Sequence, residues 1–255
     1  MLKPNVTLIG YTTFVPEAAI EATDFRYSVD SADPESGAEL VQFAGRACYQ
    51  SWDRPNPATA TTQGYMSHIL DVKHYSILRH ASASFYVQGV SRSFTHEMVT
   101  HAHIARSQLS QRFVVQDAGG YITPPLFQND ETAAAILQNQ WVLAVNAYDA
   151  LLARGEKIAR DRGLTGTAAK KQAREAARAV LPNMTPTAIV LTGNHQAWRE
   201  MLEKRCAYPA DAEMRVVTAL IFERLSNLEP ELYLGLSLKY DADGYPFLVN
   251  KPTGE

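Results

Sequence analysis

The sequence has few cysteines, no long apolar run and little net charge, and each shortage excludes a class of protein. Its two cysteines, Cys48 and Cys206, imply no disulfide framework and suit a reducing compartment. No apolar run approaches the roughly 20 residues that a membrane span needs, and residues 1–10 lack the organisation of a signal peptide. The net charge of −3 gives no general attraction to nucleic acid or anionic membranes. We therefore expect a cytoplasmic protein that meets any phosphate through a local cluster of arginines.

Phosphate loops and internal divisions are also missing. Gly119 and Gly120 precede no convincing helix, so the chain has no glycine-rich phosphate loop. No internal repeat, low-complexity tract or linker divides the 255 residues. We expect one domain over residues 1–255, with a polar tail from about residue 241.

Hydrophobic periodicity predicts a mixture of helices and strands. Alternation over residues 81–88 gives the clearest strand. Ser36 and Glu39 form a capping-box pattern before a helix with Leu40 and Phe43 on its apolar face, and Asn194 is a plausible N-cap. Further strands are expected at residues 5–10, 187–191 and 232–238, further helices at 65–70, 131–162, 167–181, 197–206 and 209–225, and a surface excursion at 12–37.

Residues 91–113, hereafter the signature segment, concentrate more chemistry than any other stretch, including three histidines and three arginines. Apolar residues at steps of three and four, from Phe94 through Met98 and Ala102, predict one helix with a polar opposite face. A half-buried helix with a solvated polar side would explain most such patterns. The ending at residues 107–112 favours phosphate binding, because it combines small hydroxyls, two amides and the planar charge of Arg112.

The signature segment resembles the flavin-dependent thymidylate synthase family (ThyX). That family's signature reads RHR, two residues, Ser, four residues, Ser, one residue, Arg. In this chain the signature positions run from residue 100 to residue 112, and His101, Ser110 and Arg112 match. The resemblance extends to ELVQFAGRACYQSW (residues 39–52), HYSILRHASASFYVQGVSRSFTHE (74–97), KQAREAARAVLPN (171–183) and TGNHQAW (192–198). It implies an α+β fold, with a single domain in which helices cover a central, mainly antiparallel sheet.

The resemblance also implies a reductive methylation of dUMP to dTMP. The carbon donor would be 5,10-methylenetetrahydrofolate, and FAD reduced by NADPH would supply the hydride, in a homotetramer. Ser76, His101 and Asn194 match flavin-binding positions, and Arg205 matches the catalytic arginine that faces the uracil. The residues expected at dUMP are Glu97, Gln108, Leu109, Ser110, Gln111, Arg112, Arg178 and Arg205.

Several positions depart from the family pattern, and three of them lose a positive charge. The departures are Thr100, Ala102, Ala105, Gln196 and Glu200. Arg79 and Arg106 stand where relatives usually carry no arginine, and we hypothesise that they partly restore the positive field. Two lost charge-assisted contacts, at roughly 1.5–3 kcal/mol each, would weaken FAD binding by one to several orders of magnitude.

Other candidate sites have simpler explanations. His96 and Glu97 resemble the start of a zinc-protease motif, but the next histidine is His101, roughly 140° away on a straight helix, so we expect no metal. Cys206 beside Arg205 could be a nucleophile of low pKa, although a buried structural thiol is the commoner case.

Three functions remain open from the sequence. The first is a working thymidylate synthase, and the second is an FAD- or nucleotide-binding paralogue with little synthase activity. The third is a nucleic-acid binder that uses the basic stripe of Lys170, Arg174 and Arg178. The acidic overall charge argues against the third, which would leave the signature segment without a role.

Overall fold

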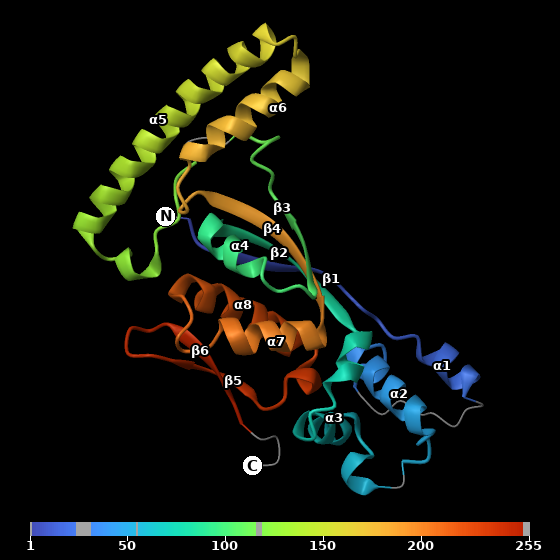
Figure 1. The fold of residues 1–255 in the computed structure, drawn as a ribbon. Helices are drawn as coiled ribbons and strands as arrows, with labels where there is room; N and C mark the ends of the chain where they lie inside the picture. The colour runs from blue at the N-terminus through green and yellow to red at the C-terminus, as the bar shows by residue number, and fades with distance from the viewer. Residues whose placement is uncertain (1, 24–31, 55, 116–118, 252–255) are drawn as a thin grey trace. The chain divides into compact units, whose positions relative to one another are not determined.

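Helices and short strands alternate along the chain in the computed structural model, which describes residues 2–23, 32–54, 56–115 and 119–251 (Figure 1). The strands are β1 (Asn5–Tyr11), β2 (Ser82–Ser91), β3 (Ile104–Gln108), β4 (Pro186–Asn194), β5 (Leu236–Tyr240) and β6 (Pro246–Asn250). The α-helices are α1 (Pro16–Ala22), α2 (Gly37–Tyr49), α3 (Thr62–Asp71), α4 (Arg92–Met98), α5 (Glu131–Asp161), α6 (Gly166–Ala177), α7 (His195–Arg205) and α8 (Ala212–Leu228). Within the described part of the chain, no helix is long and apolar enough to cross a membrane.

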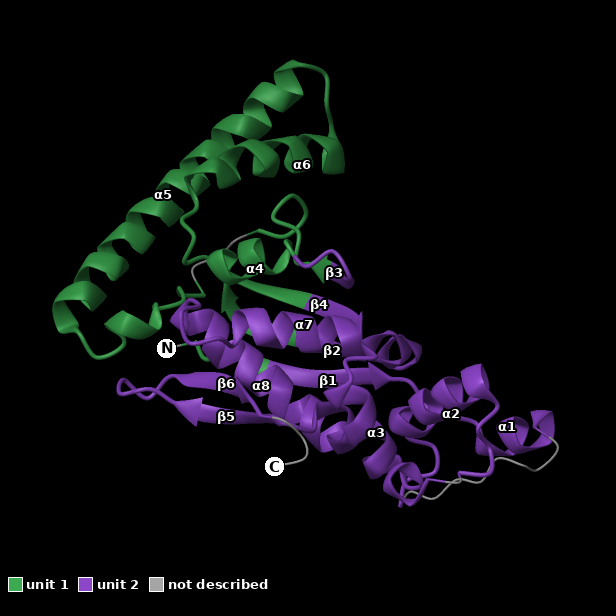
Figure 2. Ribbon diagram, turned by 60° about the horizontal axis from the view of Figure 1, so that its bottom comes forward, with its two compact units in different colours: residues 1–5, 87–100, 107–189 green, residues 6–86, 101–106, 190–255 purple. Residues whose placement is uncertain are grey.

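A four-stranded sheet with the order β1-β2-β4-β3 accompanies a separate two-stranded sheet, β5-β6. The β5-β6 pair is antiparallel, with Leu238 opposite Leu248. The chain divides into unit 1 (residues 1–5, 87–100 and 107–189) and unit 2 (residues 6–86, 101–106 and 190–255), so β2 and β4 each run through both units (Figure 2). The α+β class is confirmed, and the assignment of residues 1–255 to one domain stays a prediction.

Local capping chemistry sets the helix starts that position the functional residues. The Ser36 hydroxyl accepts a hydrogen bond from the Glu39 amide at 3.3 Å, and the Asn194 Oδ1 accepts one from the Ala197 amide at 2.9 Å. Both caps were predicted, because each side chain satisfies an amide that the first helical turn leaves unpaired.

Strand β2 supplies the centre of the core. Ala81, Ala83, Phe85 and Val87 are fully buried, as the alternation predicted. Trp198 on α7 packs edge-on against Phe85 with 5.3 Å between ring centroids, and its indole N–H donates to the Ala83 carbonyl at 3.1 Å. These contacts tie α7 to the strand at the point where α7 begins to carry functional side chains.

The signature segment is not one helix, which corrects the sequence prediction. Helix α4 ends at Met98, and residues 104–108 form the strand β3. The amide and hydroxyl of Thr100 both donate to the Glu97 carbonyl, at 3.2 and 2.8 Å, and this closes the last turn of α4. β-branched residues reduce helix propensity here, and Ala102 lies exposed in the following turn instead of on a buried stripe.

Helix α2 buries a different face from the predicted one. Leu40 and Phe43 are only partly buried, and they pack against a small cluster that includes Phe14 and Trp52. The fully buried residues of α2 combine Ala38 and Val41 with a polar network: Thr62 donates to Glu39 at 2.5 Å, Gln42 donates to Thr62 at 2.6 Å, and Arg46 donates to Gln42 at 2.8 Å. Apolar periodicity misses this face because hydrogen bonds, not hydrocarbon, make it suitable for burial.

The stretch expected to be a surface excursion contains the mostly exposed helix α1, and residues 24–31 of that stretch lie outside the described residues. Two predictions for the C-terminal part of the chain were wrong. The late strand starts at Leu236, because residues Pro230–Tyr233 form a 3₁₀ helix that buries Leu232 and Tyr233. The polar tail expected from residue 241 instead forms β6, which completes the pair with β5.

His195, the first residue of α7, gives a prediction for stability against pH. Its ring is 1% exposed with Nδ1 2.8 Å from the Tyr233 hydroxyl, and burial lowers its pKa from 6.5 to about 4. The neutral ring is therefore favoured in the folded state, and its contribution to stability is complete above pH 6.5 and is lost as the pH falls from 6.5 to 4. Between pH 7.5 and pH 4, the parent should lose about 3 kcal/mol more unfolding free energy than His195→Gln, measured by urea unfolding.

The comparison of the parent with His195→Gln also cancels the effect of Glu229, whose contribution to stability changes with pH in the opposite direction. Burial raises the pKa of Glu229 to about 7, so its contribution is complete below pH 4.5 and is lost as the pH rises to 7. Because Glu229 is present in both proteins, its effect cancels in the difference. Parallel pH profiles for the parent and His195→Gln would contradict the role given to His195.

Candidate functional site

The end of the signature segment is held in unit 1 by strand β4 and helix α4. The Leu109 amide donates to the Ala188 carbonyl at 2.9 Å, which continues the pairing of β3 with β4. The Gln108 Nε2 donates to the Thr95 hydroxyl at 2.7 Å and to the Thr187 hydroxyl at 3.4 Å. The position of Gln108 is therefore fixed by two neighbouring elements.

Residues 110–114 form a tight turn after β3. The amides of Phe113 and Val114 donate to the Ser110 carbonyl at 3.1 and 3.0 Å, and the Arg112 amide donates to the Ser110 hydroxyl at 3.3 Å. Gln111 is buried, whereas the Leu109 side chain is exposed. The Arg112 Nε pairs with the Glu175 carboxylate on α6 at 2.9 Å, and both side chains remain about half exposed. Arg112 is thus held at the surface by a weak ion pair that a ligand can replace.

Helix α6 turns its basic residues toward this turn. Arg174 donates from Nη1 to the Phe113 carbonyl at 3.0 Å, and the Lys171 ammonium lies 5.4 Å from the centre of the Phe113 ring. Arg174 and Lys171 are therefore held against the turn, whereas Lys170 is exposed.

Arg92 and Arg178 form the strongest positive feature of unit 1. Burial and the nearby charge of Arg178 lower the pKa of Arg92. Within the described ranges, no carboxylate pairs with either guanidinium. Two like charges in a partly desolvated place favour an anion between or beside them. Our sequence analysis missed Arg92, although it lies in the stretch that resembles the family.

In unit 2, Arg205 is oriented by His101. The Arg205 Nε donates to the His101 Nε2 at 2.8 Å, which requires an unprotonated acceptor nitrogen. Burial lowers the pKa of His101, and the neighbouring Arg205 and Lys204 lower it further, so the neutral ring is favoured. Cys206, next in sequence, is fully buried, and burial raises the pKa of its thiol. The nucleophile hypothesis for Cys206 is therefore not supported.

Asn194 lines a hollow of about 240 Å³ in unit 2 together with Arg79, Gln196 and Glu200. The Arg79 Nε donates to the Gln196 Oε1 at 2.6 Å, and the Gln196 Nε2 donates to the Glu200 Oε1 at 2.8 Å. Three of the positions that depart from the family pattern therefore contact one another in a directed chain of hydrogen bonds. This hydrogen-bonded chain is hereafter the Arg79 relay.

The predicted site residues fall into three local groups. Gln108 to Arg112 and Arg178 lie in unit 1, where Glu97 sits half-buried on α4; Arg205 and His101 are bonded to each other in unit 2; and Asn194 lines the hollow of the Arg79 relay. Ser76 is exposed on the 3₁₀ helix Tyr75–His80 and does not line that hollow.

In the described ranges, no three histidine, cysteine, aspartate or glutamate side chains come together in a group that could hold a metal ion. The angular argument against a shared site for His96 and His101 was wrong, because α4 ends between them.

Comparisons with known proteins identify the family of this chain. A family model described as thymidylate synthase complementing protein matches residues 31–231. The flavin-dependent thymidylate synthase of Mycolicibacterium gilvum is 45% identical over 228 residues, covering 88% of this chain and 91% of the relative. That of Mycobacteroides abscessus is 43% identical over 240 residues, covering 94% and 92%.

Two solved structures share the fold at low identity. The UMP/dUMP methylase PolB from Streptomyces cacaoi, bound with 5-Br dUMP, aligns with a TM-score of 0.62 and 19% identity, covering 91% of this chain and 93% of that one. ThyX from Helicobacter pylori with FAD and dUMP aligns with a TM-score of 0.56 and 16% identity, covering 90% and 99%. The fold expected from the resemblance is confirmed, and the chain belongs to the thymidylate synthase complementing protein family.

Proposed function

We propose that this protein is a flavin-dependent thymidylate synthase, which converts dUMP to dTMP by reductive methylation. The observation that carries the proposal is the pair of like charges in unit 1, where the partly buried Arg92 lies close enough to Arg178 for that charge to lower its pKa further. Family membership and the names of the close relatives support the reaction. The proposed co-substrates are 5,10-methylenetetrahydrofolate and NADPH.

The dUMP phosphate would lie at the turn after β3. Arg112 offers a planar fork, Ser110 a hydroxyl, and Arg92 and Arg178 two further positive charges that lack carboxylate partners in the described chain. Glu97, Gln108, Leu109 and Gln111 complete the proposed nucleotide site. A phosphate would neutralise charges that otherwise repel one another.

Arg112→Ala should raise the dissociation constant for dUMP by about 10- to 100-fold, because a charge-assisted pair is lost. Glu175→Gln should lower it by about two- to fivefold, because the competing ion pair disappears. Calorimetric titration with dUMP measures both changes.

The matched control is Glu156→Gln, which removes another exposed ion pair of unit 1, with Arg160 at 2.7 Å on α5. It should leave dUMP binding at the parent value. Equal dUMP affinities for Arg112→Ala and the parent would remove Arg112 from the site.

Arg205 is the proposed catalytic residue at the uracil. Its guanidinium would stabilise negative charge that develops on the pyrimidine, which has its largest effect in the transition state. His101 holds Arg205 in place by accepting its Nε–H at 2.8 Å. When bound, FAD would supply the hydride, so the chain's own residues need only bind, orient and stabilise.

The test of the proposed function combines a flavin absorbance spectrum of the purified protein with tritium release from dUMP labelled at C5. With methylenetetrahydrofolate and NADPH present, the parent should release tritium. Arg205→Ala should lose turnover far more than dUMP affinity, and Cys206→Ser should keep most of both, because the thiol is buried.

Flavin binding without tritium release in the parent would instead identify a nucleotide-binding paralogue. A folded, flavin-bound Cys206→Ser protein without turnover would restore the cysteine as a nucleophile.

The side chains of unit 2 fit a flavin nucleotide. Asn194, His101 and Ser76 are neutral polar groups, and Arg79 adds one positive charge to the hollow beside Asn194. Glu200 opposes that charge in the same hollow and accepts the hydrogen bond of Gln196. In the proposed site, Arg79 would supply part of the positive field that Thr100 and Ala102 do not, and Glu200 offsets it.

Glu200→Gln should tighten FAD binding by about fivefold, since it removes one carboxylate while keeping the size and an acceptor oxygen. Quenching of flavin fluorescence on binding measures the affinity without any turnover. Glu223→Gln, at an exposed position of α8 in the same unit, should bind FAD like the parent. An unchanged affinity in Glu200→Gln would place FAD away from the Arg79 relay.

A homotetramer is proposed as the assembled form. Helix α5 exposes apolar side chains at Ile136, Leu143, Leu151 and Ile158, and steps of seven and eight place all four on one side of the helix. A continuous exposed apolar stripe is typical of an association surface. The cytoplasmic location stays a prediction, with the exposed free thiol of Cys48 as its support.

A further inference from the structure

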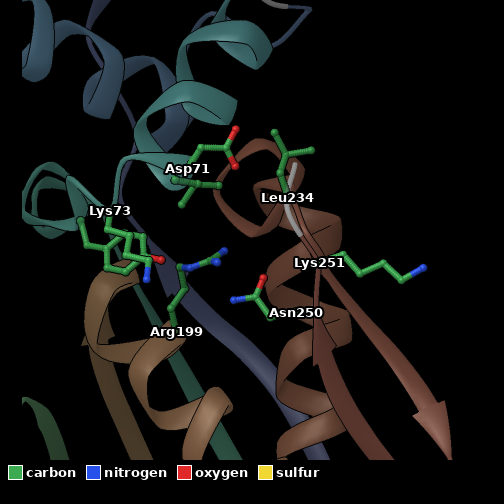
Figure 3. Close-up of a pocket in the computed structure, with 8 residues that line it drawn as sticks. Asp71, Lys73, Arg199, Leu234, Asn250 and Lys251 are labelled. Carbon is green, nitrogen blue, oxygen red and sulfur yellow. The ribbon is translucent and has the colours of Figure 1, made fainter. Parts of the chain in front are cut away.

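A second hollow in unit 2 has a volume of about 310 Å³ (Figure 3). The end of α3, the residues after it, α7 and the end of β6 contribute its walls. Its volume is at the lower end of the range for small-molecule sites. None of its lining residues belongs to the proposed dUMP or FAD sites, so it has no role in the function described above.

Arg199 on α7 is the unusual residue of this hollow. Its side chain is only 4% exposed, and in Figure 3 it extends from α7 into the space between Lys73 and Asn250. Its Nη1 donates to the Leu232 carbonyl at 2.9 Å. Its Nη2 comes no closer than 4.0 Å to the Glu203 carboxylate, and its Nε has no hydrogen-bond partner within the described residues. Nε is closed off from solvent, so Nη2 is the nitrogen through which Arg199 can meet a ligand in the hollow.

A buried guanidinium in this state costs free energy, because its lost hydration is only partly replaced. The rings of Tyr75 and Tyr233 lie 5.8 and 6.0 Å from its central carbon and compensate in part. Burial lowers the pKa of Arg199, and Glu203, Tyr233 and Tyr75, which also hydrogen-bonds the side chain, oppose that shift. A guanidinium N–H that faces a hollow can donate a charge-assisted hydrogen bond to a carboxylate or phosphate oxygen.

The charges around the hollow select the size of the anion. Lys73, Arg199 and Lys251 line it with three positive charges, while Asp71 in its wall and Glu203 beside Arg199 bring two negative ones. The net charge around the hollow is therefore +1. A monoanion balances this charge, whereas a phosphate dianion exceeds it.

The remaining walls favour an organic ligand. Leu70 and Leu234 present hydrocarbon, and Tyr75 adds a half-buried ring. Asn250 adds an amide at the far side, 3.4 Å from the Glu203 carboxylate. Apolar walls around one charged anchor are the usual composition of a site for a small organic acid.

We propose that this hollow binds a small organic monocarboxylate, with its carboxylate on the Nη2 of Arg199 between Lys73 and Lys251 and its apolar body against Leu234 and Tyr75. This site is independent of the flavin reaction. It gives the protein a second small-molecule site on α7, the helix that also carries Gln196, Glu200 and Arg205.

Calorimetric titration of the full-length protein with butyrate, in a buffer free of carboxylate and phosphate, tests the proposal. Butyrate should bind at least about tenfold more tightly than butyramide, its uncharged analogue, and more tightly than inorganic phosphate. Arg199→Lys keeps the charge but removes the planar guanidinium, so it should weaken butyrate binding by about tenfold. Equal binding of butyrate and butyramide, tighter binding of phosphate, or an Arg199→Lys protein that binds like the parent would overturn the proposal.

A rim variant covers the case in which Arg199→Lys fails to fold. Lys73→Ala combined with Lys251→Ala changes two exposed lysines and should weaken butyrate binding by about two- to fivefold. Lys239→Ala, at an exposed position of β5 outside the hollow, is the matched control. Unchanged butyrate binding in the double variant would overturn the proposal, and parent-like affinities for dUMP and FAD in it would separate this result from the proposed function.

Discussion

The cap that Asn194 places on α7 is the interaction on which the chemistry of unit 2 depends. It ends β4 and fixes the first turn of the helix through the Ala197 amide at 2.9 Å. From that start, the 100° step of the helix assigns each side chain its direction. Gln196 and Glu200 join Arg79 in the relay, and Trp198 packs into the core. Arg199 enters the second hollow, and Arg205 donates to His101. A shift of one residue in the cap would redirect all of them.

Unit 1 depends on a different constraint, the crowding of positive charge. Burial and the nearby charge of Arg178 lower the pKa of Arg92, while Glu175 holds Arg112 and the Phe113 carbonyl holds Arg174. Such an arrangement costs stability when no ligand is present. A bound anion removes the repulsion, so ligand affinity and folding stability are thermodynamically linked in this unit.

Much of this arrangement follows from local sequence. The Ser36 and Asn194 caps, the burial of β2 and the long helix α5 could be predicted, because each depends on residues close in sequence. The break of the signature segment could not, since Thr100 ends α4 by a side-chain bond that apolar periodicity ignores. Arg112 and Arg178 were singled out from the sequence, whereas the closeness of Arg92 to Arg178 was not.

Long-range polar contacts were outside the reach of sequence patterns. Arg79 and Gln196 are separated by 117 positions, and Arg112 and Glu175 by 63. Nothing in either local sequence specifies the partner. The substitution of residues 196 and 200 therefore looked like a loss of charge, whereas the fold joins both to an arginine gained elsewhere.

The course of β2 and β4 through both units has a consequence for how this protein can change. Each unit is assembled from three separate stretches of chain, and the boundary between the units cuts both strands in the middle. A cut at that boundary would leave each unit with broken strands and unpaired backbone groups. Neither unit can therefore be inherited or exchanged as one continuous segment of chain, so the two units must evolve together by point substitution.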